Sequence, residues 1–435
     1  MNEESELDWS AYESYGAGDA YAQLPATGGA YGKAASVCIG NRQCQKNDKG
    51  VMCPSFRVTQ DEAHSTRNRA VALKAMLDGQ YSLSGPELEE AMDLCVGCKG
   101  CKRECPNGVD MALLRTEYLA RRGKQEGMPL RQRLFGSLPR YAHLLRRFDV
   151  LFRLRNGMPL LAKFAEIFTG ISSRRALPLA KKSFLEDAPD FSGTGDEVVL
   201  FVDTFSNHFD PENAKAALNV LVAAGYKVRV VKSGRPLCCG RTYLSSGMVE
   251  EARNEAKRIV DFLYPYAELG LPVIGLEPSC LLMLRDEYHA LGLGEKVGQI
   301  SKSAVLLEEF LAKEKDAKRL NLELSPVPYK KALVHGHCHQ KAFGAMKSMR
   351  KVLSLIPELE VEFIESSCCG MAGAFGMEAE HYDISMKMAE LSLLPRLREE
   401  GEDAFLVANG TSCRHQAGRG QHLSILLEMA LMKSS

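Results

Sequence analysis

The sequence of 435 residues balances 55 basic against 55 acidic side chains, so its formal net charge is zero. This balance excludes the strongly positive surface of a protein that binds nucleic acid in bulk, and no nucleic-acid partner is expected. Single hydrophobic cores rarely grow beyond ~250 to 300 residues, so the length predicts several domains. The longest apolar stretches, such as residues 198–202, are far shorter than the ~20 residues that cross a bilayer. Because the acidic start lacks the features of a secretory signal, we expect a cytoplasmic protein.

The first 34 residues form an acidic segment. Six Asp or Glu side chains precede the first basic residue, Lys33, and glycine and alanine are frequent. This composition predicts a flexible tail over residues 1–34. Within it, Trp9, the only tryptophan of the chain, is interpreted as a loose aromatic side chain.

A cysteine-rich module follows over residues 35–125. Helices are predicted at 66–77 and 111–122, and another should run to about residue 94 from a capping box of Ser84 and Glu87. Between them, four cysteines spell C-x2-C-x2-C-x3-C-P over residues 95–106. This spacing is typical of ferredoxins that hold two iron-sulfur clusters. A zinc site is the alternative, but zinc motifs usually pair two CxxC units across a longer gap.

The module predicts two clusters with unequal ligand sets. In two-cluster ferredoxins the last cysteine of each motif ligates the other cluster. The first cluster is therefore assigned to Cys53, Cys95, Cys98 and Cys101, and the second to Cys38, Cys44 and Cys105. The first should be 4Fe-4S. The second lacks a cysteine because Asn41 stands in its place, so it could be 3Fe-4S, or 4Fe-4S with a non-cysteine ligand such as Asn41.

A basic segment, residues 126–195, is predicted to be a helical linker. Between Arg131 and Lys182, twelve Lys or Arg side chains stand against two acidic ones, with leucines and phenylalanines interleaved. This pattern is typical of amphipathic helices that lie on an anionic membrane or bind an acidic partner. A linker with a solvated basic face explains it equally well. Membrane contact through residues 131–182 would make the protein peripheral on the cytoplasmic face of the inner membrane.

The remaining chain is an internal repeat, with a first copy at 196–328 and a second at 329–435. The triplet CCG recurs at an offset of 130 residues, and a later cysteine recurs at an offset of 133. Strands are expected near 198–204, 227–231 and 273–277 in the first copy, and near 332–335, 361–365 and 405–408 in the second. Strands that alternate with helices imply parallel sheets, whose carboxyl ends carry function.

The cysteines of the two repeats differ in number. The second repeat has a complete set of four, which predicts a third metal centre: Cys338, Cys368, Cys369 and Cys413. The first repeat has only Cys238, Cys239 and Cys280, because the position aligned with Cys338 falls at about Phe205. For these three cysteines a vestigial thiol core, a zinc site and an incomplete cluster all stay open. Four histidines flank the complete set and could serve as ligands or proton carriers: His335, His337, His339 and His415.

Longer motifs make the chain recognisable. The segments CVGCKGCKRECP, HGHCHQKAFG, SSCCGMAGAFGMEAEHYDIS and VANGTSCRHQ resemble the iron-sulfur half of FAD-linked 2-hydroxy acid dehydrogenases. That group includes the glycolate oxidase iron-sulfur subunit and the D-lactate and D-2-hydroxyglutarate dehydrogenases, within a broader CCG-domain family. The resemblance covers about residues 38–420. It implies that the cysteines above ligate clusters, and that the chain passes electrons from a partner FAD subunit to a quinone or a soluble carrier.

Two observations bear on this resemblance. The sequence contains no G-x-G-x-x-G and no Walker motif, so FAD is expected on the partner and not on this chain. The CXXC ending of heterodisulfide reductase is absent after Cys413, which weakens the alternative of a catalytic subunit that reduces a disulfide or another small substrate. The expected fold is α+β and multidomain, with a helical two-cluster ferredoxin-like module, a basic helical linker and a duplicated α/β CCG domain with parallel strands.

Overall fold

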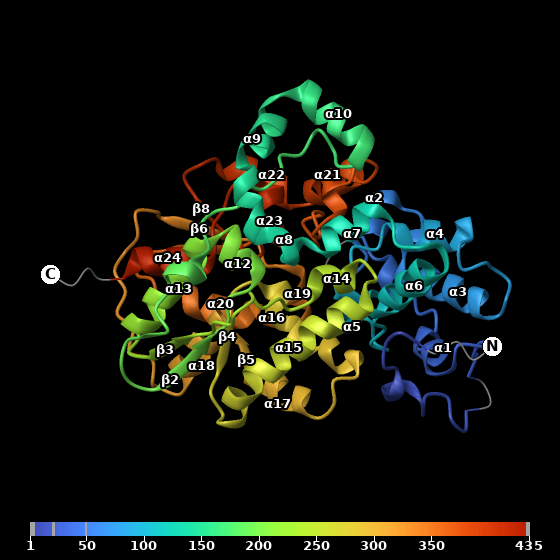
Figure 1. Cartoon of the computed structure of the whole chain (residues 1–435), viewed down its shortest axis with the longest axis horizontal. Helices are drawn as coiled ribbons and strands as arrows, with labels where there is room; N and C mark the ends of the chain where they lie inside the picture. The colour runs from blue at the N-terminus through green and yellow to red at the C-terminus, as the bar shows by residue number, and fades with distance from the viewer. Residues whose placement is uncertain (1–4, 20–21, 48–49, 432–435) are drawn as a thin grey trace.

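The computed structural model describes residues 5–19, 22–47 and 50–431. Figure 1 shows a helical N-terminal module on one side and two small sheets, wrapped in helices, on the other. The chain is an α+β multidomain protein, as predicted. No helix within the described ranges is long and apolar enough to span a bilayer.

The N-terminal module is built from short helices. Two of them, α3 and α6, lie where the sequence predicts helices, whereas α4 begins one position later than its predicted capping box. Gly85 is the N-cap of α4 and Ser84 makes no capping bond, because Pro86 forces the residue before it into an extended conformation. The helices of the module are η1 (Ser10–Tyr12), α1 (Gly29–Ser36), η2 (Gln43–Gln45), α2 (Pro54–Thr59), η3 (Glu62–His64), α3 (Thr66–Leu77), α4 (Pro86–Asp93), α5 (Gly100–Glu104) and α6 (Met111–Glu126).

The described part of the acidic segment packs against this module, which corrects the expectation of a flexible tail. Trp9 is buried and its Nε1 donates to Glu117 Oε2 at 3.1 Å. The same carboxylate accepts from the Leu7 backbone nitrogen at 2.9 Å. The tryptophan ring also lies 5.3 Å from the ring of Tyr31. A buried carboxylate on α6 and an aromatic cluster therefore anchor a segment whose composition alone suggested disorder.

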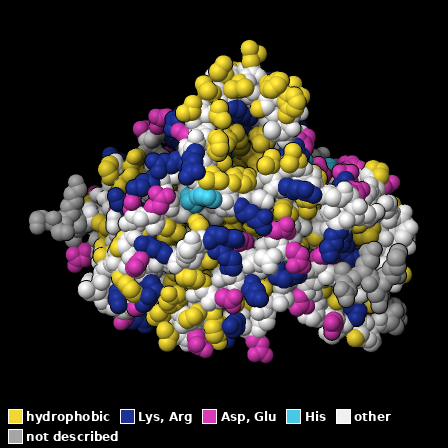
Figure 2. Space-filling model, in the orientation of Figure 1, with side chains coloured by type: hydrophobic (Ala, Val, Ile, Leu, Met, Phe, Trp, Pro, Cys, Tyr) yellow, Lys and Arg dark blue, Asp and Glu magenta, His cyan; other side chains and the backbone are white. Residues whose placement is uncertain are grey.

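The basic segment is mostly helical, as expected, and it connects the two cysteine-rich parts of the chain. Its helices are α7 (Leu130–Gly136), α8 (Leu138–Leu145), η4 (Arg146–Phe148), α9 (Asp149–Gly157), α10 (Pro159–Thr169) and α11 (Phe184–Asp187). Arg155 and Arg175 are buried, and Arg175 donates to the Gly376 carbonyl at 2.9 Å and to Gln416 at 2.7 Å. Helices α9 and α10 project from the body as a hairpin (Figure 1), and Figure 2 shows that hydrophobic side chains cover it.

The first repeat forms a five-stranded sheet in the order β1-β3-β2-β4-β5. Its strands are β1 (Phe191–Ser192), β2 (Glu197–Leu200), β3 (Lys227–Val230), β4 (Val273–Gly275) and β5 (Ala304–Leu306). The three predicted strands are present and parallel, and only β1 runs antiparallel. Around this sheet lie α12 (Thr204–His208), α13 (Pro211–Ala223), α14 (Arg241–Ser245), α15 (Val249–Glu268), α16 (Pro278–Arg285), η5 (Glu287–Leu291), α17 (Lys296–Ser303) and α18 (Leu307–Asp316).

The second repeat forms a three-stranded parallel sheet in the order β7-β6-β8. Its strands are β6 (Lys331–Val334), β7 (Glu360–Phe363) and β8 (Phe405–Val407). This order reproduces β3-β2-β4 of the first repeat, so the duplication found in the sequence is also a duplication of topology. The accompanying helices are α19 (Cys338–Ala342), α20 (Met346–Leu353), η6 (Phe375–Met377), α21 (Tyr382–Glu390), α22 (Leu393–Glu400), α23 (Thr411–Ala417) and α24 (Leu423–Ala430).

The hydrophobic core is continuous across the parts of the chain. One cluster of buried side chains joins the N-terminal module to the first repeat, and another joins the two repeats through helices α13 and α24. Because side chains from different parts exclude water together, the parts form one body rather than independent domains on a string. The cysteine loops lie at the carboxyl ends of the strands, where parallel sheets place their functional residues.

Candidate iron-sulfur centres

Four cysteines of the N-terminal module line one cavity, and they are the four that the sequence assigns to the first cluster: Cys53, Cys95, Cys98 and Cys101. All four are at least nine-tenths buried. Cys95, Cys98 and Cys101 reach this cavity because the loop that carries them turns tightly. Lys99 has a positive φ of 60°, and Gly100 approaches the backbone of Met52 so closely that a Cβ would lie 3.0 Å from it.

Cys53 reaches the cavity from the other side. It adopts a left-handed conformation with φ 49° immediately before Pro54, which starts α2. Its sulfur accepts a hydrogen bond from the Thr66 backbone nitrogen at 3.2 Å. A peptide N–H that donates to a ligand sulfur stabilises negative charge there. The arrangement of four buried thiols around one cavity fits a 4Fe-4S cluster in ligand type and in number.

The three cysteines of the predicted second cluster are also neighbours. Burial raises the pKa of Cys38, and the nearby thiol of Cys105 raises it further. Contact with Cys53 is the main reason that the pKa of Cys44 is lowered to about 7, and the nearby Cys38 thiol opposes this shift. Cys44 therefore bridges the two predicted ligand sets. Asn41 is exposed, and its amide donates to Asn107 Oδ1 at 3.0 Å and accepts from the Gln43 backbone nitrogen at 3.0 Å.

The four cysteines of the second repeat form a chain of adjacent thiols. Cys338 is the first residue of α19, and Cys413 lies in the first turn of α23. Cys368 and Cys369 stand between them, and contacts between neighbouring thiols dominate the pKa of each. Gly370 permits this geometry, because its φ is 87° and a Cβ would lie 2.3 Å from the Ser385 carbonyl oxygen. The structure thus brings together the complete set that the sequence predicts.

The flanking histidines have different environments. The His335 ring joins Cys369 and Cys413 in one group whose nitrogen and sulfur atoms lie within 4.8 Å of one another. His337 caps α19 by accepting from the backbone nitrogen of His339 at 3.1 Å. The His339 Nε2 bonds to the carbonyl of Gly97 at 3.2 Å, which is part of the first cluster loop.

The first cluster cavity and the second repeat share a backbone carbonyl. Val51 O accepts from Ser367 Oγ at 2.7 Å, and Cys98 Sγ lies 4.0 Å from the same oxygen. Ser367 directly precedes Cys368 in the chain. Burial raises the pKa of Cys98 well above its usual value, and the nearby thiol of Cys338 is the second cause of this shift. The two cysteine groups are therefore direct neighbours.

The first repeat collects its three cysteines without a fourth. Cys238, Cys239 and Cys280 are buried together. Helix α12 begins at Thr204 with Asp203 as its N-cap, just as α19 begins at Cys338 with His337 as its N-cap. Thr204, and not Phe205 as the alignment of the sequence suggested, therefore occupies the position of Cys338. The shift arises because the N-cap, rather than residue spacing, fixes where the helix starts.

A buried group of charges links the first cluster loop to the first repeat, and sequence reasoning gave no signal for it. Lys99 Nζ lies 2.8 Å from Asp110, 2.9 Å from Asp286 and 3.4 Å from Glu287. Burial alone lowers the pKa of Lys99, but these three carboxylates raise it well above the usual lysine value. Glu287 also pairs with Arg241 at 2.7 Å, next to the first CCG triplet. Two of the carboxylates lie far from Lys99 along the chain, so only the fold reveals them.

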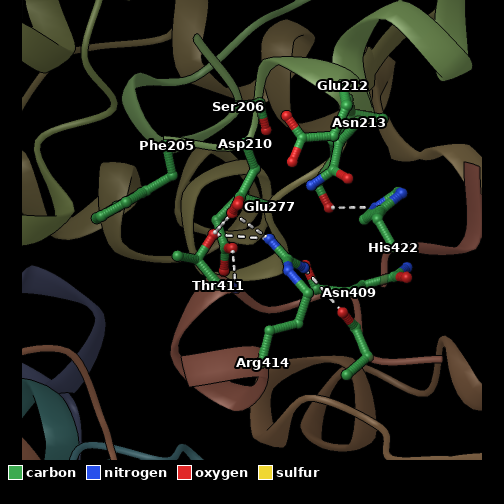
Figure 3. Close-up of polar contacts among 12 residues, drawn as sticks. Phe205, Ser206, Asp210, Glu212, Asn213, Glu277, Asn409, Thr411, Arg414 and His422 are labelled. Atoms are coloured by element: carbon green, nitrogen blue, oxygen red, sulfur yellow. Dashed lines mark hydrogen bonds and ion pairs between the residues drawn. The ribbon is translucent and has the colours of Figure 1, made fainter. Parts of the chain in front are cut away.

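The interface between the two repeats is polar. Figure 3 shows Arg414 and Thr411 of the second repeat directed toward Asp210 and Glu277 of the first. The Thr411 backbone nitrogen donates to Glu277 Oε2 at 2.8 Å, and its hydroxyl donates to Asp210 at 3.0 Å. These bonds tie the first turn of α23, which carries Cys413, to the opposite repeat.

Comparison with known proteins finds two domain families in the chain. Residues 34–109 match the family model of the 4Fe-4S dicluster domain, and residues 332–417 match that of the cysteine-rich domain called CCG. The chain is 25% identical to a D-2-hydroxyglutarate dehydrogenase of Escherichia coli (strain K12), over 89% of this chain but 42% of that protein. It therefore spans about two fifths of the length of this relative. No solved structure matches the chain.

Two shorter relatives from the same strain match as well. The glycolate oxidase iron-sulfur subunit is 24% identical over 88% of this chain and 91% of its own length. One subunit of the anaerobic glycerol-3-phosphate dehydrogenase is 29% identical over 54% of this chain and 59% of its own length. The chain therefore carries a 4Fe-4S dicluster domain and a cysteine-rich CCG domain, and it is similar to iron-sulfur proteins whose names include 2-hydroxy acid dehydrogenases.

Proposed function

We propose that this chain is the iron-sulfur electron-transfer subunit of a flavin-dependent 2-hydroxy acid dehydrogenase, of the glycolate, D-lactate or D-2-hydroxyglutarate type. It relays electrons from a partner FAD subunit to a quinone or another carrier. The observation that carries this proposal is the shared Val51 carbonyl, which brings Cys98 next to Ser367 and the second CCG triplet. Cysteine groups in direct contact give electrons a continuous route through the protein.

The ligand sets follow from the contacts above. The first cluster is held by the four cavity cysteines, and the second by Cys38, Cys44 and Cys105. Because the Asn41 amide is engaged with Asn107 and Gln43, we propose that three thiolates alone hold the second cluster from the protein side. The third centre lies at the four cysteines of the second repeat, and the first repeat holds none, because Thr204 occupies the position of its fourth thiol.

When bound, clusters at these positions accept and donate single electrons. The protein contributes the surroundings. It keeps the thiols of the first cavity at least nine-tenths buried, which excludes water, and it offers the Thr66 N–H to Cys53 at 3.2 Å. The buried Arg69 side chain adds positive charge to the lining of the same cavity. Buried positive charge and N–H donors favour the reduced, more negative state of a cluster.

The oxidation of the hydroxy acid takes place on a partner. Two relatives carry names that describe them as subunits, one of a glycolate oxidase and one of a glycerol-3-phosphate dehydrogenase, and these names support a complex of this kind. The D-2-hydroxyglutarate dehydrogenase extends well beyond the part that this chain matches, which is consistent with a further, flavin-binding portion that a separate subunit supplies here.

The α9–α10 hairpin supports contact with a membrane that holds the quinone. Its exposed apolar side chains are Phe148, Val150, Leu151, Leu154, Met158, Leu160, Leu161, Phe164, Ile167 and Phe168. Arg146, Arg147, Arg153 and Lys163 are exposed beside them. An apolar tip with basic flanks fits an anionic lipid surface, because the tip enters the acyl region while the cations meet headgroups. We place this contact on the cytoplasmic face of the inner membrane.

Lipid vesicles test the hairpin. Leu160 and Phe168 are 87% and 71% exposed, so the double variant L160D/F168D should fold normally. It should lose binding to anionic phospholipid vesicles, whereas Leu269→Asp, at a site that is 75% exposed elsewhere, should retain it. If both variants bind vesicles like the parent, and L160D/F168D loses the flavin subunit instead, the hairpin is a protein interface.

Anaerobic purification with the flavin subunit tests the relay itself. Iron and sulfide analysis with EPR should show at least two clusters, and Cys98→Ser should remove one of them together with electron transfer from the hydroxy acid to a quinone analogue. Thr116→Ser, at a buried residue of α6 that is not among the residues lining the first cluster cavity, is the control. Turnover of a heterodisulfide without any flavin partner would instead favour a catalytic CCG subunit.

A further inference from the structure

We propose that His335 is a direct metal ligand of the third centre, through Nε2, alongside the thiolates of the second repeat. The inference rests on the proposed presence of a metal centre in that repeat. It adds an imidazole to a site for which the sequence offers four cysteines. The centre would then have mixed nitrogen and sulfur ligation.

The position of His335 is fixed by the sheet. It directly follows β6, and its backbone nitrogen donates to the Val407 carbonyl of β8 at 2.9 Å. Cys413 lies on the helix that follows β8. The two adjacent strand ends therefore deliver an imidazole and a thiol to the same place. A ring nitrogen of His335 and the sulfur atoms of Cys369 and Cys413 lie within 4.8 Å of one another, and all three residues are buried.

The two ring nitrogens of His335 have different roles. Nδ1 lies 3.0 Å from Ser366 Oγ, and Lys341 Nζ donates to that hydroxyl at 2.8 Å and to the Ser366 carbonyl at 2.6 Å. Since a lysine can only donate, Ser366 Oγ retains a lone pair that can accept from Nδ1–H. A hydrogen bond at one ring nitrogen that fixes the tautomer and ring orientation is the usual support of a metal-binding histidine.

Nε2 is then left as a buried nitrogen with a lone pair. It has no nitrogen or oxygen partner among the residues that the structure describes, and the His335 ring contacts the Cys369 sulfur instead. His335 is only 1% exposed. Leaving such a group unsatisfied is costly, whereas a metal ion satisfies it.

The first repeat supplies an internal comparison. Phe201 directly follows β2, and its backbone nitrogen donates to the Ile274 carbonyl at 2.9 Å, as His335 does toward Val407. The aromatic ring of Phe201 is 1% exposed and fills this position without any donor atom. The repeat that has only three cysteines therefore also lacks the imidazole. The missing thiol and the missing imidazole are both at the place in the first repeat that is equivalent to the third centre.

An imidazole ligand changes what the centre does. Replacing thiolates by imidazoles raises the reduction potential of an iron-sulfur centre, because the neutral ring places less negative charge on the metal. A higher potential suits a centre at the accepting end of a relay. The variant His335→Cys should therefore retain metal and shift the midpoint potential of the third centre to a lower value.

Spectroscopy on the intact protein tests the assignment without a variant. Protein labelled with 15N only in histidine is reduced anaerobically, and pulsed EPR measures the coupling between the electron spin and nitrogen. Direct ligation gives a strong coupling that His335→Gln abolishes and that His415→Gln leaves unchanged. His415 is the matched control, because it lies two residues from Cys413 and bonds to the backbone of Ala176 instead.

The outcomes separate this inference from the proposed function. If Cys413→Ala removes no metal, the third centre itself is absent. If Cys413→Ala removes metal but the histidine coupling is weak, His335 only donates a hydrogen bond to sulfur and the ligand assignment is wrong. Should the second repeat hold zinc, X-ray absorption on the same samples counts its ligands, and an all-sulfur shell overturns the assignment.

Discussion

The two repeats share a strand order but carry different residues at equivalent strand ends. Phe201, Asp203 and Thr204 follow β2, where His335, His337 and Cys338 follow β6. The scaffold is thus kept while the donor atoms differ. A duplicated fold can retain its packing in both copies and its metal chemistry in one.

The pKa values of the cysteines also differ between the two repeats. In the first repeat, contact with Cys239 raises the pKa of Cys238 well above its usual value, and burial does the same for Cys239. Contact with Cys239 lowers the pKa of Cys280, but burial raises it to about 12. In the second repeat, contact with Cys368 and then the charge of His337 lower the pKa of Cys338 well below its usual value. Contact with Cys368 also lowers the pKa of Cys369, whereas contacts with neighbouring thiols raise the pKa of Cys368 and Cys413. Two of the four thiols in the second repeat therefore favour thiolate, and none of the three in the first repeat does.

The first repeat acts instead as a support. Its Asp286 and Glu287 surround Lys99 in the loop of the first cluster, and its Glu277 accepts from the first turn of the helix that carries Cys413. The repeat that lacks a complete ligand set therefore holds in place the loops of both neighbouring cysteine groups.

The largest expected effect separates the two repeats by metal content. Cys413→Ala should remove the third centre completely, as measured by iron and sulfide per chain in anaerobic protein. Cys280→Ala, at the equivalent place in the first repeat, should leave metal content unchanged and cost only about 1 kcal/mol of stability through lost packing. Equal metal loss in both variants would contradict the division of roles.

A gain of function sharpens the same comparison. Thr204→Cys combined with Phe201→His introduces a fourth thiol and an imidazole at the positions of Cys338 and His335. The double variant should bind up to one further metal ion or cluster per chain, which metal analysis detects. The single variant Phe201→His serves as the control, because it still lacks the fourth thiol. No added metal in the double variant would mean that the first repeat excludes metal for a reason beyond its missing ligands.

The supporting role of the first repeat predicts a large loss of stability at Lys99. Lys99→Met leaves Asp110, Asp286 and Glu287 buried without their shared cation, and removing one partner of a buried ion pair costs about 3–5 kcal/mol. Lys102 contacts two of the same carboxylates but is 40% exposed. Lys102→Met should therefore cost less than about 1 kcal/mol. Urea unfolding of the two variants, followed anaerobically, compares them, and similar losses would contradict this account.

The smallest effect is a pH dependence that originates in the first repeat. Burial, and then the charge of Glu277, raise the pKa of Asp203 to about 6. A carboxyl with a raised folded-state pKa favours the protonated form, so stability should fall by about 2–3 kcal/mol as the pH rises from about 4 to about 6. Asp203→Asn keeps the acceptor that caps α12 and should flatten this part of the pH profile. An unchanged profile would show that Asp203 is not its source.

Local pattern predicted much of the fold. The spacing of the cysteines in residues 95–106 and the two CCG triplets predicted groups of cysteines that lie together in the structure, because short spacings leave few geometries. Cys44 is the exception, since it contacts Cys53 of the other predicted group. The strands of both repeats lie within a few residues of their predicted places, since buried parallel strands are apolar runs. The cap of α4 and the position equivalent to Cys338 were each off by one residue, because helix starts depend on local backbone conformation.

Long-range contacts could not be predicted in this way. The anchoring of Trp9 by Glu117 and the burial of Lys99 depend on residues more than a hundred positions away. The sequence by itself determined which side chains can ligate metal and that the second half is duplicated, because residue type and spacing are local. Only the tertiary structure decided that the first cluster loop lies against the second repeat, and that His335 rather than its neighbours joins the thiols, because those positions follow from which strands pair.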